Sequence, residues 1–416
     1  MTTHKLEALM KPYFPKVLEY REHIHQNPEI SYHETQTAAY VAAKMKSWGY
    51  EVFTQYGGGY GVVARLQRGP KPYIGIRADM DALPVDELVE SPIQSKKRMM
   101  YDGQETGVSH ACGHDVHTAA ALATAELVAS DPDFKGTILF IFQPAEEGGK
   151  KEGLLNSGAE QMLKDGLFED LPKPDVLFTL HVIGGMKTGV FALGSGLQAA
   201  NSAFFEINLT GVQGHGSSPW VTKDPISCAA QIISNTQTIV SREANLTRGA
   251  AVITYGSIHG GLRENIIPSE VTMKGTIRNL DTVNHKLVLA SLEKKVKAIA
   301  KMNGIEAKFT LYNPVPALYN NPEVTAQTAR VLKDIPNAKY VADDISPGTG
   351  YDDASQFHNL MPACYFLVGG ADPTGKIKAG GNHTPFFHIT DEAVRNSLRG
   401  FVYLIYDYLE NPYLSE

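Results

Sequence analysis

The densest group of chemistry-bearing residues is the segment HACGHDVH, residues 110–117. It holds three histidines, a cysteine and an aspartate in eight positions. Cys112 and His114 are two residues apart, so both side chains can reach one ion from a loop. Histidine, thiolate and carboxylate are typical ligands of zinc and other first-row divalent metals. The spacing therefore predicts a metal site at Cys112 and His114, whereas Asp115 has the alternative role of N-cap to a following helix.

A pair of adjacent acids lies in the segment QPAEEGG, residues 143–149, directly after an apolar run. Two carboxylates that leave a buried strand are costly unless a charged group faces them. Adjacent side chains point in different directions, so one of Glu146 and Glu147 can bind a metal while the other moves a proton. The alternative is a solvated acidic turn.

Two isolated histidines and a second acid pair extend the group. His181 closes the apolar run VLFTLH, and His383 lies in the glycine-rich loop GGNHTPFF. Taken singly, either histidine would be an ordinary structural residue. Asp79 and Asp81 follow another apolar run and lie on one side of it, as expected of carboxylates that stand behind metal-bound histidines.

Together these stretches supply five ligand-type residues, namely Cys112, His114, Glu147, His181 and His383. Two metal ions need about that number of protein ligands when one ligand bridges and water completes the site. A thiolate can bridge, because metal binding deprotonates it.

The elements that position these residues alternate between apolar strands and helices, which predicts an α/β sheet buried on both faces. Open sheets of this kind keep their clefts at the strand ends, where the candidate residues lie. The expected strands here are 60–66, 73–78, 137–142, 176–181 and 363–368. The expected helices are 4–26, 34–48, 117–129, 322–334 and 391–410.

Near residue 200 the pattern changes to strand 202–211, helix 224–240, strands 250–258 and 269–278, helix 283–303 and strand 306–313. The order βαββαβ is the ferredoxin-like α+β arrangement. The 416 residues suggest two or three domains. We predict a catalytic domain made of 1–199 and 316–416, interrupted by a lid domain at 200–315.

Composition excludes several functional classes. The net charge is −7 with no basic block, so nucleic acid and anionic membranes are poor partners. No apolar run is long enough for a transmembrane helix. Three cysteines make no disulfide framework in a chain of this length, which favours a cytoplasmic location. Cys228 and Cys364 are predicted to pack as small hydrophobes.

The segments HACGHDVH, QPAEEGG, RADMDALP and NHTPFF together resemble the metallo-amidohydrolases of the aminoacylase/carboxypeptidase family. The subgroup with the strongest resemblance contains hippurate hydrolases, N-acyl-amino-acid amidohydrolases and auxin-conjugate hydrolases. Two further segments resemble the lid domain of that subgroup, namely GVQGHGSSPW at 211–220 and GGLRENIIPSEVTMKGTIR at 260–278. The resemblance implies a zinc-peptidase-like catalytic domain, with a mixed sheet flanked by helices, and an inserted ferredoxin-like lid through which the chain dimerises.

The resemblance also implies a dinuclear site of zinc or manganese, with cobalt and nickel as further candidates. Cys112 would bridge the two ions. His114 and His181 would hold one ion, and Glu147 and His383 the other.

For catalysis, the resemblance implies that Glu146 is the general base. His215 would reach the developing oxyanion from a lid, its own or that of a partner subunit. Asn265 and Arg278 would contact the substrate.

Several departures bear on specificity. Asp79 stands where the wider family has a histidine before its supporting Asp81. The segment KKEGLLNS, 150–157, is longer than the usual link, and Asp352-Asp353-Ala354 stands for the usual Glu-Asp-Phe. The longer link and the Asp352-Asp353-Ala354 triplet bear on substrate preference. Arg263 is expected to be a solvated surface charge, with binding of an acidic substrate as the alternative.

We therefore expect a dinuclear amidohydrolase that cleaves N-acyl-amino acids. A metal-bound water has its pKa lowered towards about 7, and Glu146 would take its proton and pass it to the leaving amine. A dipeptidase or carboxypeptidase with the same centre is the first alternative, and a binding protein without catalysis is the second. His110 and His117 receive no assigned role. Trp48 and Trp220 are expected to pack, with contact to substrate as the alternative for Trp220, which follows the His215 loop.

Overall fold

The computed structural model of the chain describes residues 1–101, 103–149, 154, 156–375 and 380–412. The chain divides into two compact units. Unit 1 consists of Met1–Gln198, Tyr319–Ser346 and Asp353–Glu416, and unit 2 consists of Ala199–Leu318 and Pro347–Asp352. The catalytic and lid roles of the two domains remain predictions.

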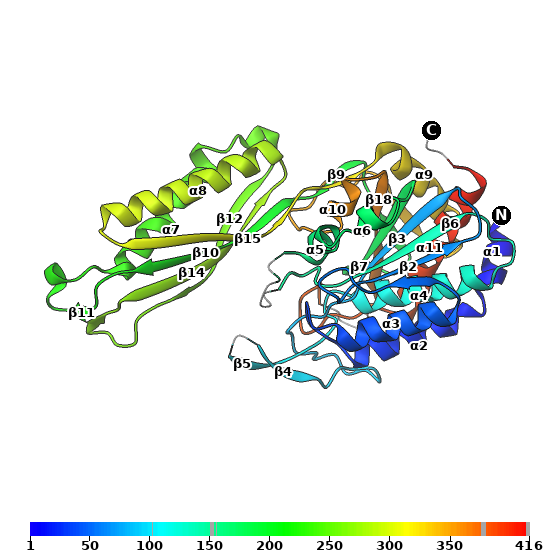
Figure 1. Ribbon diagram of the computed structural model, residues 1–416, viewed down its shortest axis with the longest axis horizontal. Helices are drawn as coiled ribbons and strands as arrows, with labels where there is room; N and C mark the ends of the chain where they lie inside the picture. The colour runs from blue at the N-terminus through cyan, green and yellow to red at the C-terminus, as the bar shows by residue number, and fades with distance from the viewer. Residues whose placement is uncertain (102, 150–153, 155, 376–379, 413–416) are drawn as a thin grey trace. The chain divides into compact units, whose positions relative to one another are not determined.

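A mixed sheet of eight strands forms the centre of unit 1 (Figure 1). From edge to edge, its strands are β1 (Glu51–Phe53), β2 (Val62–Gln67), β6 (Thr137–Gln143), β3 (Tyr73–Asp79), β7 (Val176–Lys187), β18 (Ala363–Ala371), β8 (Val190–Ala192) and β17 (Tyr340–Ala342). β3 is parallel to both β6 and β7, whereas β2 is antiparallel to β6. The carboxyl ends of β3 and β6 therefore meet at one edge of the sheet, where Asp79 and the 143–149 segment follow.

Hydrophobic residues on both faces of the sheet explain its burial. Along β6, Ile138, Phe140 and Phe142 join one core while Leu139 and Ile141 join the other. The larger core includes residues of helices α1 (Thr3–Met10), α2 (Tyr13–Gln26), α3 (Thr35–Ser47), α4 (His114–Ser130), α9 (Pro322–Lys333) and α11 (Asp391–Glu410). The smaller core includes residues of α5 (Gly158–Lys164), α6 (Leu167–Asp170) and α10 (Ser355–His358). The predicted α/β class, with a mixed sheet flanked by helices, is confirmed.

Two helix boundaries differ from the prediction, each for a local reason. The expected helix 4–26 is divided into α1 and α2, and Pro12 lies at the N-cap of α2. Proline lacks the amide hydrogen and sterically opposes continuation of a helix. Helix α4 begins at His114, three residues early, because Gly113 occupies the N-cap in a left-handed conformation with φ 93°. Asp115 lies in the first turn and is not the N-cap.

Shorter strands complete the connections. They are β4 (Arg98–Tyr101), which pairs with β5 (Gln104–Gly107), and β9 (Gly196–Ala199) and β16 (Leu318–Asn320), where the chain passes between the units.

Unit 2 contains a four-stranded antiparallel sheet in the order β12, β14, β10, β15, packed against two helices. In chain order its main elements are β10 (Asn201–Thr210), α7 (Pro225–Arg242), β12 (Ala251–His259), β14 (Glu270–Asn279), α8 (Thr282–Met302) and β15 (Glu306–Val315). Its short elements are β11 (Gly214–His215), β13 (Ile266–Ile267) and the 3-10 turns Pro219–Val221 and Leu246–Arg248.

The sequence of α7 explains its start and its buried face. The Asp224 side chain accepts the amide hydrogen of Ile226 at 2.9 Å, and proline follows it at the first helical position. Cys228, Ile232 and Ile239 recur at helical spacing and are fully buried.

No helix among the described residues is both long and apolar enough to traverse a bilayer.

Candidate metal centre

The five predicted ligand residues come from four segments of unit 1. Cys112 directly precedes α4 and His114 is its first residue, while His181 lies within β7. Glu147 follows β6, and His383 lies in the loop before α11 with a left-handed φ of 66°. The fold brings all five side chains together.

Cys112 lies at the centre of this cluster. Its Sγ is 3.3 Å from His181 Nε2 and 3.2 Å from His383 Nε2. Ligand atoms of Cys112, His114 and His181 lie within 4.8 Å of one another, as do those of Cys112, Glu147 and His383. The thiol belongs to both groups, which is the position that a bridging ligand requires.

The histidine rings present their Nε2 atoms to the cluster. His114 Nδ1 is 2.8 Å from the Asp81 carbonyl oxygen, and His181 Nδ1 is 2.9 Å from that of Val182. These contacts place the ring hydrogens on Nδ1 and leave the Nε2 lone pairs for a metal. Nε2 of His114 is buried and has no hydrogen-bond partner among the described residues. Carboxylate oxygens of Asp79 and Glu146 lie 3.8 Å from that atom, and its position fits a metal ligand.

The electrostatics of the cluster favour bound cations. Burial, with the charge of Glu147, raises the pKa of the Cys112 thiol. Hydrogen bonds to Cys112 and Glu147 raise the pKa of His383 to about 10. His383 is therefore held as a cation by the acidic groups around it, and its Nε2 is 2.9 Å from Glu147 Oε1. A divalent ion can replace that proton and neutralise the same charge.

Asp81 supports the cluster from behind. Its Oδ2 accepts the hydroxyl hydrogen of Ser31 at 2.7 Å and the amide hydrogen of Glu147 at 3.0 Å. Its Oδ1 accepts the amide hydrogen of Glu146 at 3.1 Å and lies 3.2 Å from His114 Nδ1. Burial raises the pKa of Asp81, but the hydrogen bond and charge of His114 outweigh burial and lower it.

Asp79 belongs to a buried ion network that borders the cluster, since its Oδ2 also lies 3.8 Å from His114 Nε2. It bonds to Arg77 Nη1 at 2.7 Å and to His117 Nδ1 at 2.6 Å. His117 Nε2 accepts the amide hydrogen of Val182 at 2.9 Å. Both nitrogens of His117 are thus engaged, so this ring aligns Asp79 with the strand that carries His181 and is not a ligand.

Asp353 extends the network. It bonds to Arg77 Nη2 at 3.0 Å, to Gln143 Nε2 at 2.6 Å and to the Ala159 amide at 2.9 Å. Asp353 is fully buried and ties three segments of unit 1 together, so it supports the scaffold. The effect of Asp352 and Ala354 on substrate preference stays a prediction. Within the long 150–157 link, residues 150–153 and 155 lie outside the described residues.

Asn382 is a supporting residue that the sequence did not single out. Its Nδ2 donates to the carbonyl oxygens of Cys112 and Val182, each at 3.0 Å, and its Oδ1 accepts the Gly184 amide hydrogen at 3.0 Å. It therefore joins the loop of His383 to two other ligand segments. The signal in the sequence that could have identified Asn382 was its position directly before His383.

The candidate general base lies beside the ligands. Glu146 is 4% exposed, and its Oε2 is 3.8 Å from His114 Nε2. His110 is also buried, and neither of its ring nitrogens has a hydrogen-bond partner among the described residues. Burial lowers the pKa of His110 to about 4, so the ring is neutral.

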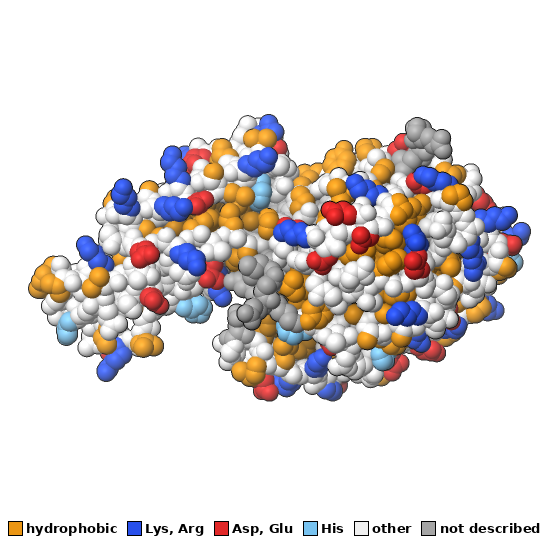
Figure 2. All heavy atoms as spheres, in the orientation of Figure 1, with side chains coloured by type: hydrophobic (Ala, Val, Ile, Leu, Met, Phe, Trp, Pro, Cys, Tyr) orange, Lys and Arg blue, Asp and Glu red, His pale blue; other side chains and the backbone are white. Residues whose placement is uncertain are grey.

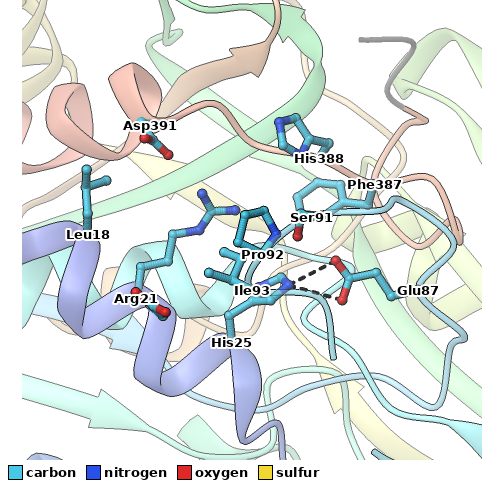
Figure 3. A pocket seen from close by; sticks show the side chains of 11 residues that line it. Leu18, Arg21, His25, Glu87, Ser91, Pro92, Ile93, Phe387, His388 and Asp391 are labelled. Carbon is cyan, nitrogen blue, oxygen red and sulfur yellow. Dashed lines mark hydrogen bonds and ion pairs between the residues drawn. The ribbon is translucent and has the colours of Figure 1, made fainter. Parts of the chain in front are cut away.

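A separate cavity of about 350 Å³ lies between α2, residues 87–93 and residues 387–391 (Figure 3). None of the five ligand residues lines it. In Figure 3, His25 points towards Glu87, with its Nε2 3.1 Å from Oε1. His25 Nδ1 and Arg21 Nε also contact Asp115 Oδ2, at 2.8 and 3.0 Å. Burial lowers the pKa of His25, but Asp115 and Glu87 outweigh burial and raise it to about 9.

The remaining predicted residues lie in unit 2. His215 is exposed in β11 and pairs with Ile266 of β13, and Asn265 directly precedes β13. Arg278 lies in β14, eight residues beyond its first residue, Glu270, which at 3.4 Å per residue is about 27 Å. Unit 2 therefore separates Arg278 from the other two residues.

Arg278 contacts two other residues of unit 2. Its Nη1 donates to Ser202 Oγ at 2.5 Å, and its guanidinium carbon lies 4.5 Å from the ring centre of Tyr351. Cys228 and Cys364 are buried, as predicted. Trp220 is 79% exposed, so the expectation that it packs is wrong.

Comparison with known proteins agrees with this geometry. Residues 75–407 match the profile of peptidase family M20/M25/M40. A hippurate hydrolase of Campylobacter jejuni is 37% identical over 349 residues, covering 84% of this chain and 86% of the relative. Thermostable carboxypeptidase 2 of Saccharolobus solfataricus is 35% identical over 399 residues, covering 94% and 95%. Bacillus subtilis YxeP, described as a dinuclear metal-binding peptidase, superposes with a TM-score of 0.71 at 27% identity and coverage of 96% and 99%.

Proposed function

The chain belongs to peptidase family M20/M25/M40 and is a hydrolase of amide or peptide bonds, and from this we propose that it is a dinuclear metal-dependent amidohydrolase of N-acyl-amino acids. The observation that carries the proposal is the Cys112 thiol, shared by two groups of ligand atoms with Glu146 beside them. The hippurate hydrolase relative supports an N-acyl-amino acid as substrate.

Two divalent ions would be held by this chain's own residues. One ion would be bound by Cys112, His114 and His181, and the other by Cys112, Glu147 and His383. Zinc and manganese both suit mixed nitrogen, oxygen and sulfur ligands, with cobalt and nickel as further candidates. When bound, such ions acidify a water molecule and polarise the substrate carbonyl.

Glu146 acts as the proton carrier in this proposal. Its carboxylate accepts a proton from the attacking water and delivers it to the amide nitrogen as the C–N bond breaks. A position that is 4% exposed limits exchange of that proton with solvent. Asp79 and Asp81 take no proton in this scheme, because hydrogen bonds from Arg77, His117 and Ser31 hold them as carboxylates.

The lid residues favour a dimer. Asn265 precedes the end of β14 that begins at Glu270, whereas Arg278 lies about 27 Å further along that strand. We infer that one substrate does not contact both residues from the same copy of unit 2. We assign His215 and Asn265 to a partner's site, where His215 stabilises the oxyanion. Hydrophobic side chains are visible on the surface of unit 2 at the end that carries β11 (Figure 2), consistent with a covered surface.

A carboxypeptidase or dipeptidase is the second candidate, favoured by the 35% identity to thermostable carboxypeptidase 2. Its metal centre would be the same. The two candidates differ in whether the amino group of the substrate is acylated.

A substrate panel with metal-reconstituted protein separates them. The panel contains benzoyl, acetyl, indole-acetyl and aminobenzoyl conjugates together with unblocked dipeptides. We expect kcat/KM to be highest on an N-acyl-amino acid. Faster hydrolysis of dipeptides would favour the second candidate, and no hydrolysis with Mn²⁺, Zn²⁺ or Co²⁺ would defeat both. We also propose a cytoplasmic location, because a bridging thiolate must stay reduced.

A further inference from the structure

The turn that carries Glu146 and Glu147 has three consecutive backbone amides that donate to buried carboxyl groups. The amide hydrogens of Glu146 and Glu147 are accepted by Asp81, as described above. The preceding amide, that of Ala145, donates to Glu34 Oε1 at 2.7 Å. Glu34 lies 111 residues earlier in the chain, between α2 and α3.

Ala145 has a backbone conformation that is rare for its residue type. Its φ is 48°, in the left-handed region, and its side chain is fully buried. An alanine in that region is strained and keeps the conformation only where its surroundings hold it. On the carbonyl side, the amides of Gly148 and Gly158 donate to Ala145 O at 3.2 and 3.0 Å. On the amide side, the described contact is Glu34.

The Glu34 side chain contacts the turn through the Ala145 amide. Glu34 occupies the N-cap position of α3, yet its side chain does not cap that helix. The residue is 0% exposed, and its Oε2 has no hydrogen-bond partner among the described residues. Burial, with the charge of Asp81, raises the pKa of Glu34 well above its usual range. A buried carboxyl with one oxygen unsatisfied is unfavourable for folding, and a function in the turn accounts for its presence.

We propose that Glu34 is a positioning residue that holds Ala145 in its left-handed conformation and thereby aims Glu146 and Glu147. The inference rests on the proposed function of those two residues. Glu34 contacts neither substrate nor metal, and it acts through the backbone of the turn. This role requires only an acceptor oxygen on residue 34, because the Ala145 amide is a hydrogen-bond donor.

Three substitutions test the geometry of that contact. Glu34→Gln keeps an acceptor oxygen at the same distance and should bind metal within about threefold of wild type. Glu34→Ala removes the acceptor, and Glu34→Asp shortens the side chain by one methylene. Both should weaken the more loosely bound ion by about 10–100-fold, the range seen when groups that orient a ligand are removed. If Glu34→Ala does not fold, Glu34→Asp is compared with wild type and Glu34→Gln in its place.

A neighbouring carboxylate provides the matched control. Glu29 is 7% exposed and accepts the amide hydrogens of Gln36 and Thr37 at 2.9 Å, so it stabilises the first turn of α3. Glu29→Ala should lower the melting temperature while leaving the affinity for both ions unchanged.

The metal-free proteins compete with a chromophoric chelator for Zn²⁺ or Mn²⁺, which gives the affinities of the first and the second bound ion. Steady-state kinetics give kcat and KM. The expected result is a weaker second ion and a lower kcat at unchanged KM in Glu34→Asp, with recovery in Glu34→Gln. Wild-type affinities in both Glu34→Ala and Glu34→Asp would overturn the inference, as would equal losses in Glu34→Gln. If wild type binds two ions but hydrolyses no amide, the proposed function fails, while the affinities still test Glu34.

Discussion

At the scale of single residues, the roles in the cluster follow from which atoms are already occupied. His114 and His181 have Nδ1 placed against carbonyl oxygens, so their Nε2 atoms face the thiol of Cys112. His117 has both nitrogens engaged, by Asp79 and by the Val182 amide. Three histidines that lie close together are therefore divided into two candidate ligands and one supporting residue by their hydrogen bonds.

Replacement of Glu146 by glutamine should separate catalysis from metal binding. The amide cannot carry the proton, so we expect kcat to fall by roughly 10²–10⁴. The metal content should remain that of wild type, because Glu146 belongs to neither group of ligands that contains Cys112. Turnover and bound metal are measured on the same preparation. Turnover near that of wild type would contradict the assignment of the base.

The pH dependence of the free energy of unfolding tests His25, which links α2 to the first turn of α4. Its pKa is raised from about 6.5 to about 9, so its protonated form stabilises the fold. That contribution, on the order of 3 kcal/mol, is complete below about pH 6.5 and is lost as the pH rises towards 9. Denaturant unfolding of wild type and His25→Gln at both pH values measures it. An equal dependence on pH in the two proteins would contradict this prediction.

At the scale of elements, the start of α4 is fitted closely to strand β7. Gly113 lies between two candidate ligands with φ 93°, and a Cβ placed there would lie 2.2 Å from Val182 Cγ2. Val182 directly follows His181. The helix start and the strand can therefore bring Cys112, His114 and His181 together only while residue 113 has no side chain.

Gly113→Ala should consequently damage the metal centre. The strained φ and the clash should lower the free energy of unfolding by about 1–3 kcal/mol and weaken metal binding at the same time. Gly185→Ala is the control, because a Cβ there meets nothing within 4 Å and its φ is not in the strained region. Calorimetry and chelator competition report both effects. Unchanged metal affinity in Gly113→Ala would show that the close approach is not needed.

At the scale of the whole molecule, the two units carry different parts of the proposed reaction. Unit 1 holds the ligand cluster and Glu146, and unit 2 holds His215, Asn265 and Arg278. Trp220 is 79% exposed and Leu262 is 101% exposed, and both lie in unit 2 close in sequence to His215 or Asn265. Side chains of this size at such exposure are typical of surfaces that bind a partner.

We therefore predict a homodimer through unit 2. Light scattering at micromolar concentration should give twice the mass of the 45.4 kDa chain. The double variant Trp220→Glu, Leu262→Glu should be monomeric and should lose activity, because the partner's His215 is then absent. Its metal affinity should not change. A wild-type monomer with full activity would contradict the dimer.

The sequence determined the chemistry and the outline of the fold. Ligand-type residues are recognisable by kind, and strand ends follow from local hydrophobic patterns, so the candidate ligands and an α/β sheet could be predicted. That the sheet is mixed was implied by the family resemblance. Local spacing misplaced the ends of α1 and α4, where Pro12 and Gly113 set the boundaries. It also misassigned Trp220, because burial depends on distant contacts.

What only the tertiary structure decided is which group serves which partner. The contact of Glu34 with Ala145 spans 111 residues, and that of Arg77 with Asp353 spans 276. No local pattern encodes such pairs, because a side chain finds its hydrogen-bond partner only after packing has fixed the backbones around it. The sequence therefore determined which atoms could bind metal, and the tertiary structure decided which of them are held in position to do so.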